Sequence, residues 1–315
     1  MSTPPPATFH PAYLALLDSG ELERRVQSAY RHMEDCDLCA RYCRVNRRQT
    51  LEGVACRTGE KAVVHSYGAH HGEEAPLSGW AGSGTLFFSW CNLRCVFCQN
   101  WEISQRGIGR EVAPEELADM MLELQSQGCH NINLVSPSHV VAQILAAVLI
   151  AARGGLRLPL VYNTGGYDSP EALALLDGVV DIYMPDMKYA DSATAHRYSH
   201  VRNYWEVNRA AVLEMHRQVG ELVLDPHGIA LRGLLVRHLV LPSDLANTDQ
   251  VLAFIAEKLS PATYVNIMDQ YFPCYRAYDY PPLDRPISGA EYAHALALAE
   301  KHGLTRLDAR QQRGR

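Results

Sequence analysis

Short apolar runs alternate with helical segments over most of the chain, and this alternation limits the fold more than any other feature. The runs expected to form strands are rich in aliphatic and aromatic residues and cover residues 84–90, 130–136, 158–164, 180–186, 234–242 and 263–269. The segments expected to form helices lie between or after them and cover residues 112–128, 140–153, 169–178, 191–218, 247–259 and 288–303. Strands and helices that alternate at this spacing predict βαβ units and a parallel sheet.

Six strand–helix units are fewer than the eight of a closed barrel, so an open six-stranded barrel or a doubly wound sheet fits the count. We expect the first, an α/β fold with an open six-stranded parallel (β/α)6 partial barrel and a cysteine-rich N-terminal extension. Residues 1–83 form the expected N-terminal arm and loop-rich cysteine segment, and residues 84–315 form the barrel domain. In either fold the active site lies at the carboxyl ends of the strands, so the loops that follow them should face one another.

Charge and hydropathy exclude two classes of partner. The 315-residue chain has a net charge of −6 and no basic stripe, so we expect no binding to nucleic acid. The most apolar run, residues 140–152, is too short to cross a bilayer, and the N-terminus lacks the pattern of a secretory signal, so we expect no membrane association. Nine cysteines without such a signal indicate metal or redox chemistry in a reducing cytoplasm.

Three cysteines follow the first expected strand at a CxxxCxxC spacing, namely Cys91, Cys95 and Cys98. Thiolates are the usual ligands of iron–sulfur clusters, and three of them can hold three corners of a 4Fe–4S cube while the fourth iron stays open to another ligand. A structural zinc loop is the alternative, but zinc sites usually have four ligands and a second half-site. Their position in the first βα loop therefore predicts that these cysteines hold a catalytic cluster.

The cysteine loop resembles the signature of the radical S-adenosylmethionine (SAM) superfamily, in which an aromatic residue, here Phe97, precedes the last cysteine. The resemblance implies a 4Fe–4S cluster whose open iron chelates the methionine part of SAM, with Phe97 packed on the SAM adenine. It also implies that reductive cleavage of SAM yields a 5′-deoxyadenosyl radical, which takes a hydrogen atom from the substrate. Cofactor and cluster supply this chemistry, while the protein positions them and excludes water.

Two further motifs resemble those of pyruvate formate-lyase activating enzymes and their uncharacterised iron–sulfur relatives. Residues 163–168, NTGGYD, are similar to a DTNG-type turn, and residues 183–188, YMPDMK, are similar to an MLDIK-type strand end. A structural Gly-rich turn and a solvated charge pair are the alternatives. The resemblance implies a SAM-binding region with a monovalent cation, formed by Asn163, Thr164, Met184 and Asp186, with Lys188 close by.

A third motif, residues 237–242, is similar to an RYVVVPG-type strand of the same enzymes. Arg237 lies inside this apolar strand, where a guanidinium is costly unless paired, so we expect it to contact an anion. The GGE motif that holds the SAM amino group in these enzymes is replaced here by SPSH, starting at residue 136. We expect Ser136 or Ser138 to supply oxygen acceptors instead.

A second group of cysteines lies in the N-terminal segment at a CxxCx3Cx12C spacing. Its members are Cys36, Cys39, Cys43 and Cys56. Four thiolates suit tetrahedral zinc or an auxiliary iron–sulfur cluster, spacing does not separate these two, and the absence of a metal is the third alternative. The remaining two, Cys129 and Cys274, are expected to be structural thiols.

These observations predict a radical SAM oxidoreductase similar to the pyruvate formate-lyase activating enzymes. Its expected partners are a glycyl radical protein as substrate and a reductant such as flavodoxin or ferredoxin. One alternative is a radical SAM enzyme that modifies a peptide or a small molecule. The other is a non-enzymatic metal-binding module in which the three cysteines after the first strand are structural.

Overall fold

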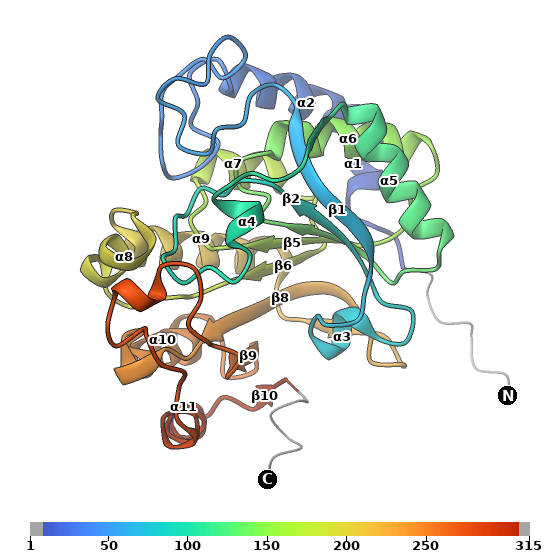
Figure 1. Cartoon of the computed structure of the whole chain (residues 1–315). Coiled ribbons are helices and arrows are strands. Elements are labelled where there is room, and N and C mark those ends of the chain that lie inside the picture. The colour runs from blue at the N-terminus through green and yellow to red at the C-terminus, as the bar shows by residue number, and fades with distance from the viewer. Residues whose placement is uncertain (1–8, 309–315) are drawn as a thin grey trace, which may run out of the picture.

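The structure, a computed structural model, describes residues 9–308, in which strands and helices alternate along most of the chain (Figure 1). The strands are β1 (Ala62–His70), β2 (Ser83–Phe88), β3 (Arg110–Val112), β4 (Ile132–Val135), β5 (Leu160–Thr164), β6 (Ile182–Pro185), β7 (Val223–Leu224), β8 (Ala230–Leu239), β9 (Tyr264–Met268) and β10 (Arg306–Leu307). The helices are α1 (Tyr13–Asp18), α2 (Glu21–His32), α3 (Ala75–Ser78), α4 (Trp101–Ser104), α5 (Pro114–Ser126), α6 (Val141–Arg153), α7 (Pro170–Leu176), α8 (Ser192–Ser199), α9 (Tyr204–Val219), α10 (Thr248–Phe254) and α11 (Gly289–Lys301).

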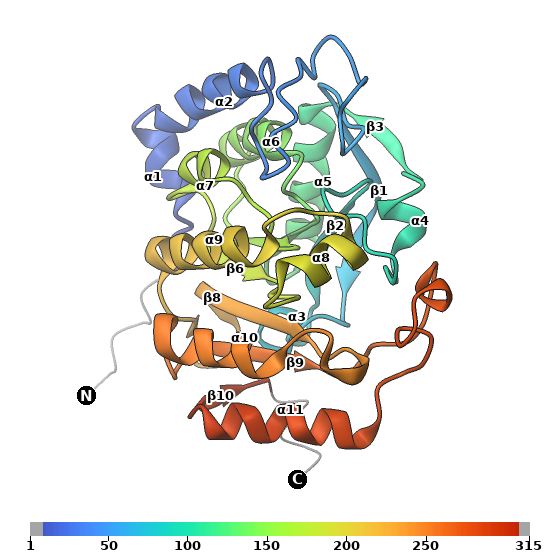
Figure 2. The ribbon, with the colours of Figure 1, turned by 90° about the vertical axis from the view of Figure 1, so that its left-hand side faces the viewer.

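Six strands, β2, β4, β5, β6, β8 and β9, pair in parallel and in that order. Because strand order follows chain order without a reversal, the connections all return on the same side and their helices cover one face of the sheet. In Figure 2, α7, α9, α10 and α11 follow one another down this side. The described sheet ends at β3 and β10, which do not pair with each other, so the barrel is open. The predicted open (β/α)6 partial barrel is confirmed, and the doubly wound alternative is excluded.

The sequence did not predict four strands, the nine-residue β1 and the short strands β3, β7 and β10. β1 and β3 extend the sheet beyond β2 in antiparallel pairing, β10 adds to β9, and β7 pairs with β8. β1 lies in the segment expected to be a loop-rich extension, which therefore contributes to the sheet itself. Its sequence, AVVHSYGAH, buries only its first residues and leaves most of the others exposed, so no apolar alternation marks it as a strand.

The long helix expected over residues 191–218 is two helices, α8 and α9. The backbone between them turns at His200 and Asn203, which have φ angles of 54° and 51°. Asn adopts this left-handed conformation more readily than most residues, but a His in it is not foreseeable from local sequence. The break matters because it brings the end of α8 to the loop that follows β2.

The strands present alternate side chains to the helices and to the barrel interior. In β8, Leu234 and Val236 belong to the core under the helices, whereas Leu235 packs in a smaller interior cluster. By the same alternation Arg237 faces the interior at the carboxyl end of this strand. The helical side of the core is centred on the apolar helix α6, which is 13 residues long. Within residues 9–308 no helix is long and apolar enough to cross a membrane.

A buried carboxylate joins the N-terminal arm to the start of β5. Asp181 accepts hydrogen bonds from the backbone N–H of Ala12 (2.8 Å) and of Leu160 (3.0 Å). Burial raises the pKa of Asp181 from 3.8 to about 7, although these two hydrogen bonds favour the ionised form. The arm is therefore attached through a carboxylate whose ionised form is disfavoured by burial in the folded protein.

We expect the free energy of unfolding to depend on pH through Asp181. The folded state binds the proton more tightly than the unfolded state, so this residue lowers stability as the pH rises from about 4 to about 7. Asp181→Asn cannot titrate, so the stability of the wild type relative to this variant should fall by about 2–3 kcal/mol between pH 5 and pH 8. Urea unfolding of both metal-free proteins measures the difference. A difference that stays constant with pH would contradict the prediction.

Candidate functional site

The loop after β2, residues 89–100 (the cysteine loop), carries the three predicted cluster ligands and contains no helix or strand. Neighbouring segments supply the hydrogen bonds that such a backbone lacks. The N–H groups of Arg94 and Val96 donate to the carbonyls of Ser199 and Tyr198 at the end of α8, over 3.0 and 2.8 Å. The position of the cysteines is therefore set by a helix that lies a hundred residues away in sequence.

The three thiols each have a polar partner. Cys95 Sγ shares a hydrogen bond with Ser199 Oγ (3.0 Å), and Cys98 Sγ shares one with Ser104 Oγ (3.1 Å). The sulfur of Cys91 accepts from a backbone N–H of its own loop (3.4 Å). Hydrogen bonds to sulfur are a standard means by which proteins tune iron–sulfur clusters. The two serines carry no signal in the sequence, because only the folded chain brings them to the cysteines.

Burial keeps these thiols protonated when nothing is bound. It raises the pKa of Cys91 to about 12 and that of Cys95 to about 11, and it also raises the pKa of Cys98. The ammonium of Lys188 lowers all three pKa values, but less than burial raises them. A cluster that binds here must displace protons, and its iron supplies the positive charge that stabilises buried thiolates.

The donor set fits a cluster better than a single ion. Within the described residues, no group of three or more His, Cys, Asp or Glu side chains is arranged to hold one metal ion. A 4Fe–4S cube is larger, and its thiolates sit at separate corners, so they need not converge on one point. Three thiols on one irregular loop, each with a hydrogen-bond donor nearby, fit a cube by ligand type and by number.

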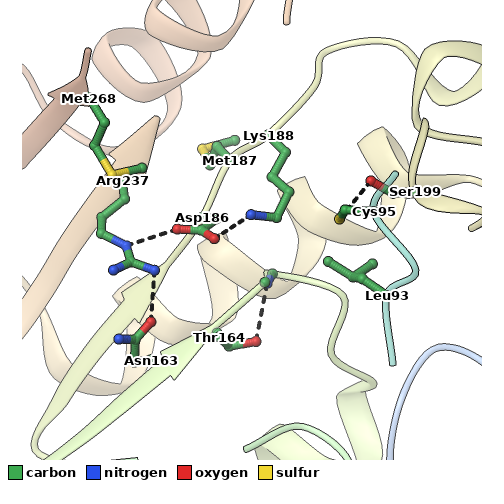
Figure 3. Close-up of polar contacts among 12 residues, drawn as sticks. Leu93, Cys95, Asn163, Thr164, Asp186, Met187, Lys188, Ser199, Arg237 and Met268 are labelled. Carbon is green, nitrogen blue, oxygen red and sulfur yellow. Dashed lines mark hydrogen bonds and ion pairs between the residues drawn. The ribbon is translucent and has the colours of Figure 1, made fainter. Parts of the chain in front are cut away.

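A buried ion network lies beside the cysteine loop (Figure 3). Asp186 accepts from Arg237 Nε (2.8 Å) through one oxygen and pairs with Lys188 Nζ through the other. Arg237 also donates to Asn163 Oδ1 (2.8 Å). Burial alone would raise the pKa of Asp186, but the charges of Arg237 and Lys188 outweigh it and hold this pKa below its ordinary value. Lys188 lies between Asp186 and Cys95, so the network faces the expected cluster site.

Backbone pairing at the strand ends fixes this network. The N–H of Asp186 donates to the carbonyl of Thr164 (2.9 Å), and the N–H of Met187 donates to the carbonyl of Arg237 (2.8 Å). The side chains of the network therefore sit at the ends of three adjacent strands, β5, β6 and β8, just where parallel pairing ends. The carboxyl ends of these strands face one another as the sequence predicted.

Two residues of α9 that the sequence analysis missed hold the loop after β5 against the end of β6. The hydroxyl of Tyr204 donates to the carbonyl of Gly165 (2.9 Å) or Asp186 (3.1 Å), and Asn208 Nδ2 donates to the carbonyls of Gly166 and Asp186, both over 3.0 Å. Gly166 has a φ of 73°, and a Cβ there would lie 2.1 Å from Asn208 Nδ2. Only glycine allows this approach.

The serines expected to replace the GGE motif lie beside β5, where the N–H of Ser136 donates to the carbonyl of Asn163 (3.0 Å), a member of the ion network. Ser138 is buried and shares a hydrogen bond with Thr164 Oγ1 (2.9 Å), which also donates to the buried carboxylate of Asp168 (2.7 Å). Tyr162 donates to the other oxygen of Asp168 (3.0 Å). Ser136 ends β4 with a φ of 59°, a conformation that glycine adopts without strain. Ser138 and Thr164 thus support the turn that follows β5, and Ser136 lies beside the end of this strand.

Phe97 is buried among aromatic rings. It meets Tyr271 and Tyr189 edge to face, with ring centroids 5.8 and 6.5 Å apart. Its carbonyl accepts from Cys274 Sγ (3.3 Å), and the N–H of Arg276 donates to the carbonyl of the preceding residue in the loop (2.9 Å). The segment after β9 therefore contacts the cysteine loop as well, and its Tyr280 packs on Tyr198 of α8.

The second cysteine group lies in an irregular lobe between α2 and β1 (Figure 1). Cys36, Cys39 and Cys56 are buried and Cys43 is half-buried. None of the nine cysteines of the chain forms a disulfide.

Comparison with known proteins agrees with this geometry. The family model described as the Radical SAM superfamily matches residues 85–225. Over 293 residues the chain is 33% identical to the uncharacterized protein MJ0674 of Methanocaldococcus jannaschii, a match that covers 90% of this chain and 79% of the relative. This chain belongs to the radical SAM superfamily. It is therefore an enzyme of radical chemistry, and the family implies a 4Fe–4S cluster and SAM.

Two further similarities were found. The uncharacterized protein MJ0808 of the same organism is 26% identical over 283 residues, covering 84% of this chain and 78% of the relative. The solved structure of TYW1 with a lysine-pyruvate adduct bound gives a TM-score of 0.41 at 11% identity, covering 70% of this chain and 74% of that chain.

We expect Asp186→Asn to destabilise the protein by about 3–5 kcal/mol, because it leaves two buried cations without their shared counter-ion. The matched control is Asp177→Asn, which breaks an ion pair with Arg217 on the surface and should change stability little. Thermal and urea unfolding of the metal-free proteins compare the two. Equal effects of the two substitutions would show that the buried network does not stabilise the site.

Proposed function

We propose that this chain is a glycyl radical enzyme activase that uses a 4Fe–4S cluster held by Cys91, Cys95 and Cys98. Bound together, cluster and SAM supply a 5′-deoxyadenosyl radical that abstracts a hydrogen atom from a substrate glycine. The observation that carries the proposal is the juxtaposition of three thiols and a buried ion network at the carboxyl ends of the strands. Cations beside the thiols suit both the negative charge of ligating thiolates and the carboxylate of SAM.

The side chains around the loop have separate tasks in this proposal. Lys188 offsets the charge of the thiolates and attracts the SAM carboxylate, while Asp186 holds the ammonium in place. Arg237 and Asn163 orient Asp186 from the next strands. Phe97 packs against the adenine. The remaining proposed contacts with SAM are Ser136, Ser138 and Thr164.

A protein substrate is supported by exposed aromatic side chains beside the cysteine loop. In the segment after β9, Phe272 is 52% exposed and Tyr278 is 65% exposed. Tyr275 in the same segment stacks on Trp101, with ring centroids 5.2 Å apart. Exposed aromatic groups are typical of surfaces that bind other proteins. In this proposal, a loop of the partner reaches the radical through the side where the barrel is not closed.

Other substrates remain as alternatives. A peptide or a small molecule would use the same cofactor chemistry, since fold and cofactor are shared by enzymes with unrelated substrates. The non-enzymatic metal-binding module is set aside, because the superfamily is one of enzymes. We propose flavodoxin or ferredoxin as the electron donor, and a reducing cytoplasm suits nine free thiols.

We expect Cys91→Ala, Cys95→Ala and Cys98→Ala, combined in one variant, to remove about four irons per chain and to abolish SAM cleavage. The matched control is Cys129→Ala, which removes a buried thiol between α5 and β4 and should keep both iron and activity. Iron analysis after anaerobic reconstitution and release of 5′-deoxyadenosine measure the two effects. Undiminished cleavage by the triple variant would end the proposal.

We expect the reduced enzyme and SAM to produce a doublet in the electron paramagnetic resonance spectrum of a glycyl radical protein from the same organism. Combined Phe272→Ala and Tyr278→Ala should weaken the doublet about tenfold by removing anchors of the interface, while the basal release of 5′-deoxyadenosine stays unchanged. Leu213→Ala, an exposed apolar residue on α9, serves as the control. Vigorous SAM cleavage without a radical on any candidate would favour a peptide or a small molecule.

A further inference from the structure

The four cysteines of the N-terminal lobe converge from two short loops. Cys36 and Cys43 lie in a turn that closes on itself, with Arg44 N–H donating to the carbonyl of Cys36 (3.0 Å). The second loop meets this turn where the N–H of Ala55 donates to Cys43 Sγ (3.5 Å). Cys39 lies in the same turn, where the N–H of Tyr42 donates to its carbonyl (3.0 Å), and Cys56 directly follows Ala55. These hydrogen bonds hold together the two loops that carry all four cysteines.

A buried arginine in this lobe points to a ligand that makes the thiols negative. Arg47 is 2% exposed, and its Nη1 donates to Cys36 Sγ (3.5 Å). Its other described hydrogen bonds go to the carbonyls of Thr58 and His139, both over 2.8 Å, and none goes to a carboxylate. A buried cation is costly without a counter-charge, and protonated thiols supply none. Thiolates bound to metal do supply it.

The lobe is hydrogen-bonded directly to the cysteine loop. Arg41, which lies between Cys39 and Cys43 in sequence, donates through Nε to the carbonyl of Asn92 (2.7 Å), next to Cys91. In the other direction, Arg94 donates through Nη2 to the carbonyl of Ala55 (2.5 Å). Residues next to or between the cysteines of the N-terminal lobe thus form hydrogen bonds with residues next to the cysteines of the cysteine loop.

We propose that Cys36, Cys39, Cys43 and Cys56 hold a second iron–sulfur cluster, which passes electrons to the cluster at Cys91, Cys95 and Cys98. Four cysteines are the usual ligand set of a cluster that only transfers electrons. The half-buried Cys43 faces the surface, and Cys56 lies next to Ala55, which contacts the cysteine loop. A reduced flavodoxin or ferredoxin gives one electron to the second cluster. That cluster is reoxidised when the electron passes on and the catalytic cluster is reduced.

This inference rests on the proposed function only for the identity of its electron acceptor, so the first experiment omits the catalytic cluster. The variant with Ala at 91, 95 and 98 is reconstituted anaerobically with iron and sulfide in the presence of equimolar zinc. We expect about two to four irons per chain to remain and to give a paramagnetic signal on reduction. Zinc in place of iron, or no bound metal, would overturn the assignment.

Arg47 provides a test that leaves the four cysteines of the N-terminal lobe in place. In the same triple-alanine background, Arg47→Gln should reduce retention of this iron about 10–100-fold, as loss of an outer-shell partner does at other metal sites. The matched control is the neighbouring Arg48→Gln, which breaks exposed ion pairs with Glu34 and Glu60 and a contact with the Tyr30 ring, none of them at a cysteine. Equal retention in both variants would show that Arg47 does not respond to a bound cluster.

The relay is tested in the otherwise unaltered enzyme without SAM, by following the optical bleaching of the catalytic cluster. We expect Cys43→Ser combined with Cys56→Ser to slow its reduction by reduced flavodoxin about tenfold or more. Arg94→Gln keeps all ligands and should slow the same step while the iron content is unchanged. In the doubly reduced wild type, magnetic interaction should broaden both signals relative to the single-cluster variants. Unchanged reduction rates with unbroadened signals would overturn the relay, even if iron is bound.

Discussion

The structure of the site depends on one buried carboxylate held between two cations. Asp186 pairs with Arg237 from β8 and with Lys188 from its own strand end. Each of these charges would be costly to bury alone, and together they are tolerated because hydrogen bonds satisfy them. The carboxyl edge of a parallel sheet exposes loops rather than regular structure. Backbone pairing sets the spacing of the three strand ends, and the ion network fixes the side chains that these ends carry.

The cysteine loop obtains its shape from segments that are distant in sequence. Its backbone bonds go to the end of α8 on one side and to the segment after β9 on the other. Its thiols are protonated when nothing is bound, because burial raises their pKa values. The backbone geometry of the loop is thus largely set before a metal binds, whereas the charge of its thiols is not. Binding a cluster here changes the charge of the loop more than it changes the fold, in contrast to small domains that fold only around a metal.

The sequence predicted the parallel strands and the expected cluster ligands because both leave local signals. Apolar runs mark buried strands, and the spacing of Cys91, Cys95 and Cys98 is visible in eight letters. β1 was missed because most of it is exposed and lacks apolar alternation. Tyr204 and Asn208 were missed for another reason. They lie on an ordinary amphipathic helix, and only the folded chain shows that their polar groups hold the loops around Asp186.

The arginines between the two cysteine groups explain how two irregular loops can be joined without secondary structure. Irregular backbone leaves carbonyl groups without partners, and each must find a donor when it is buried. Arg41, Arg47 and Arg94 each donate to a carbonyl of a segment distant in sequence. Arg47 does this while its Nη1 donates to Cys36 Sγ, a span that the single ammonium of a lysine cannot bridge. The same side chains therefore supply hydrogen bonds to the backbone and positive charge near the thiols. A change in the contacts between the loops would also change the electrostatics of the lobe, and the reverse holds as well.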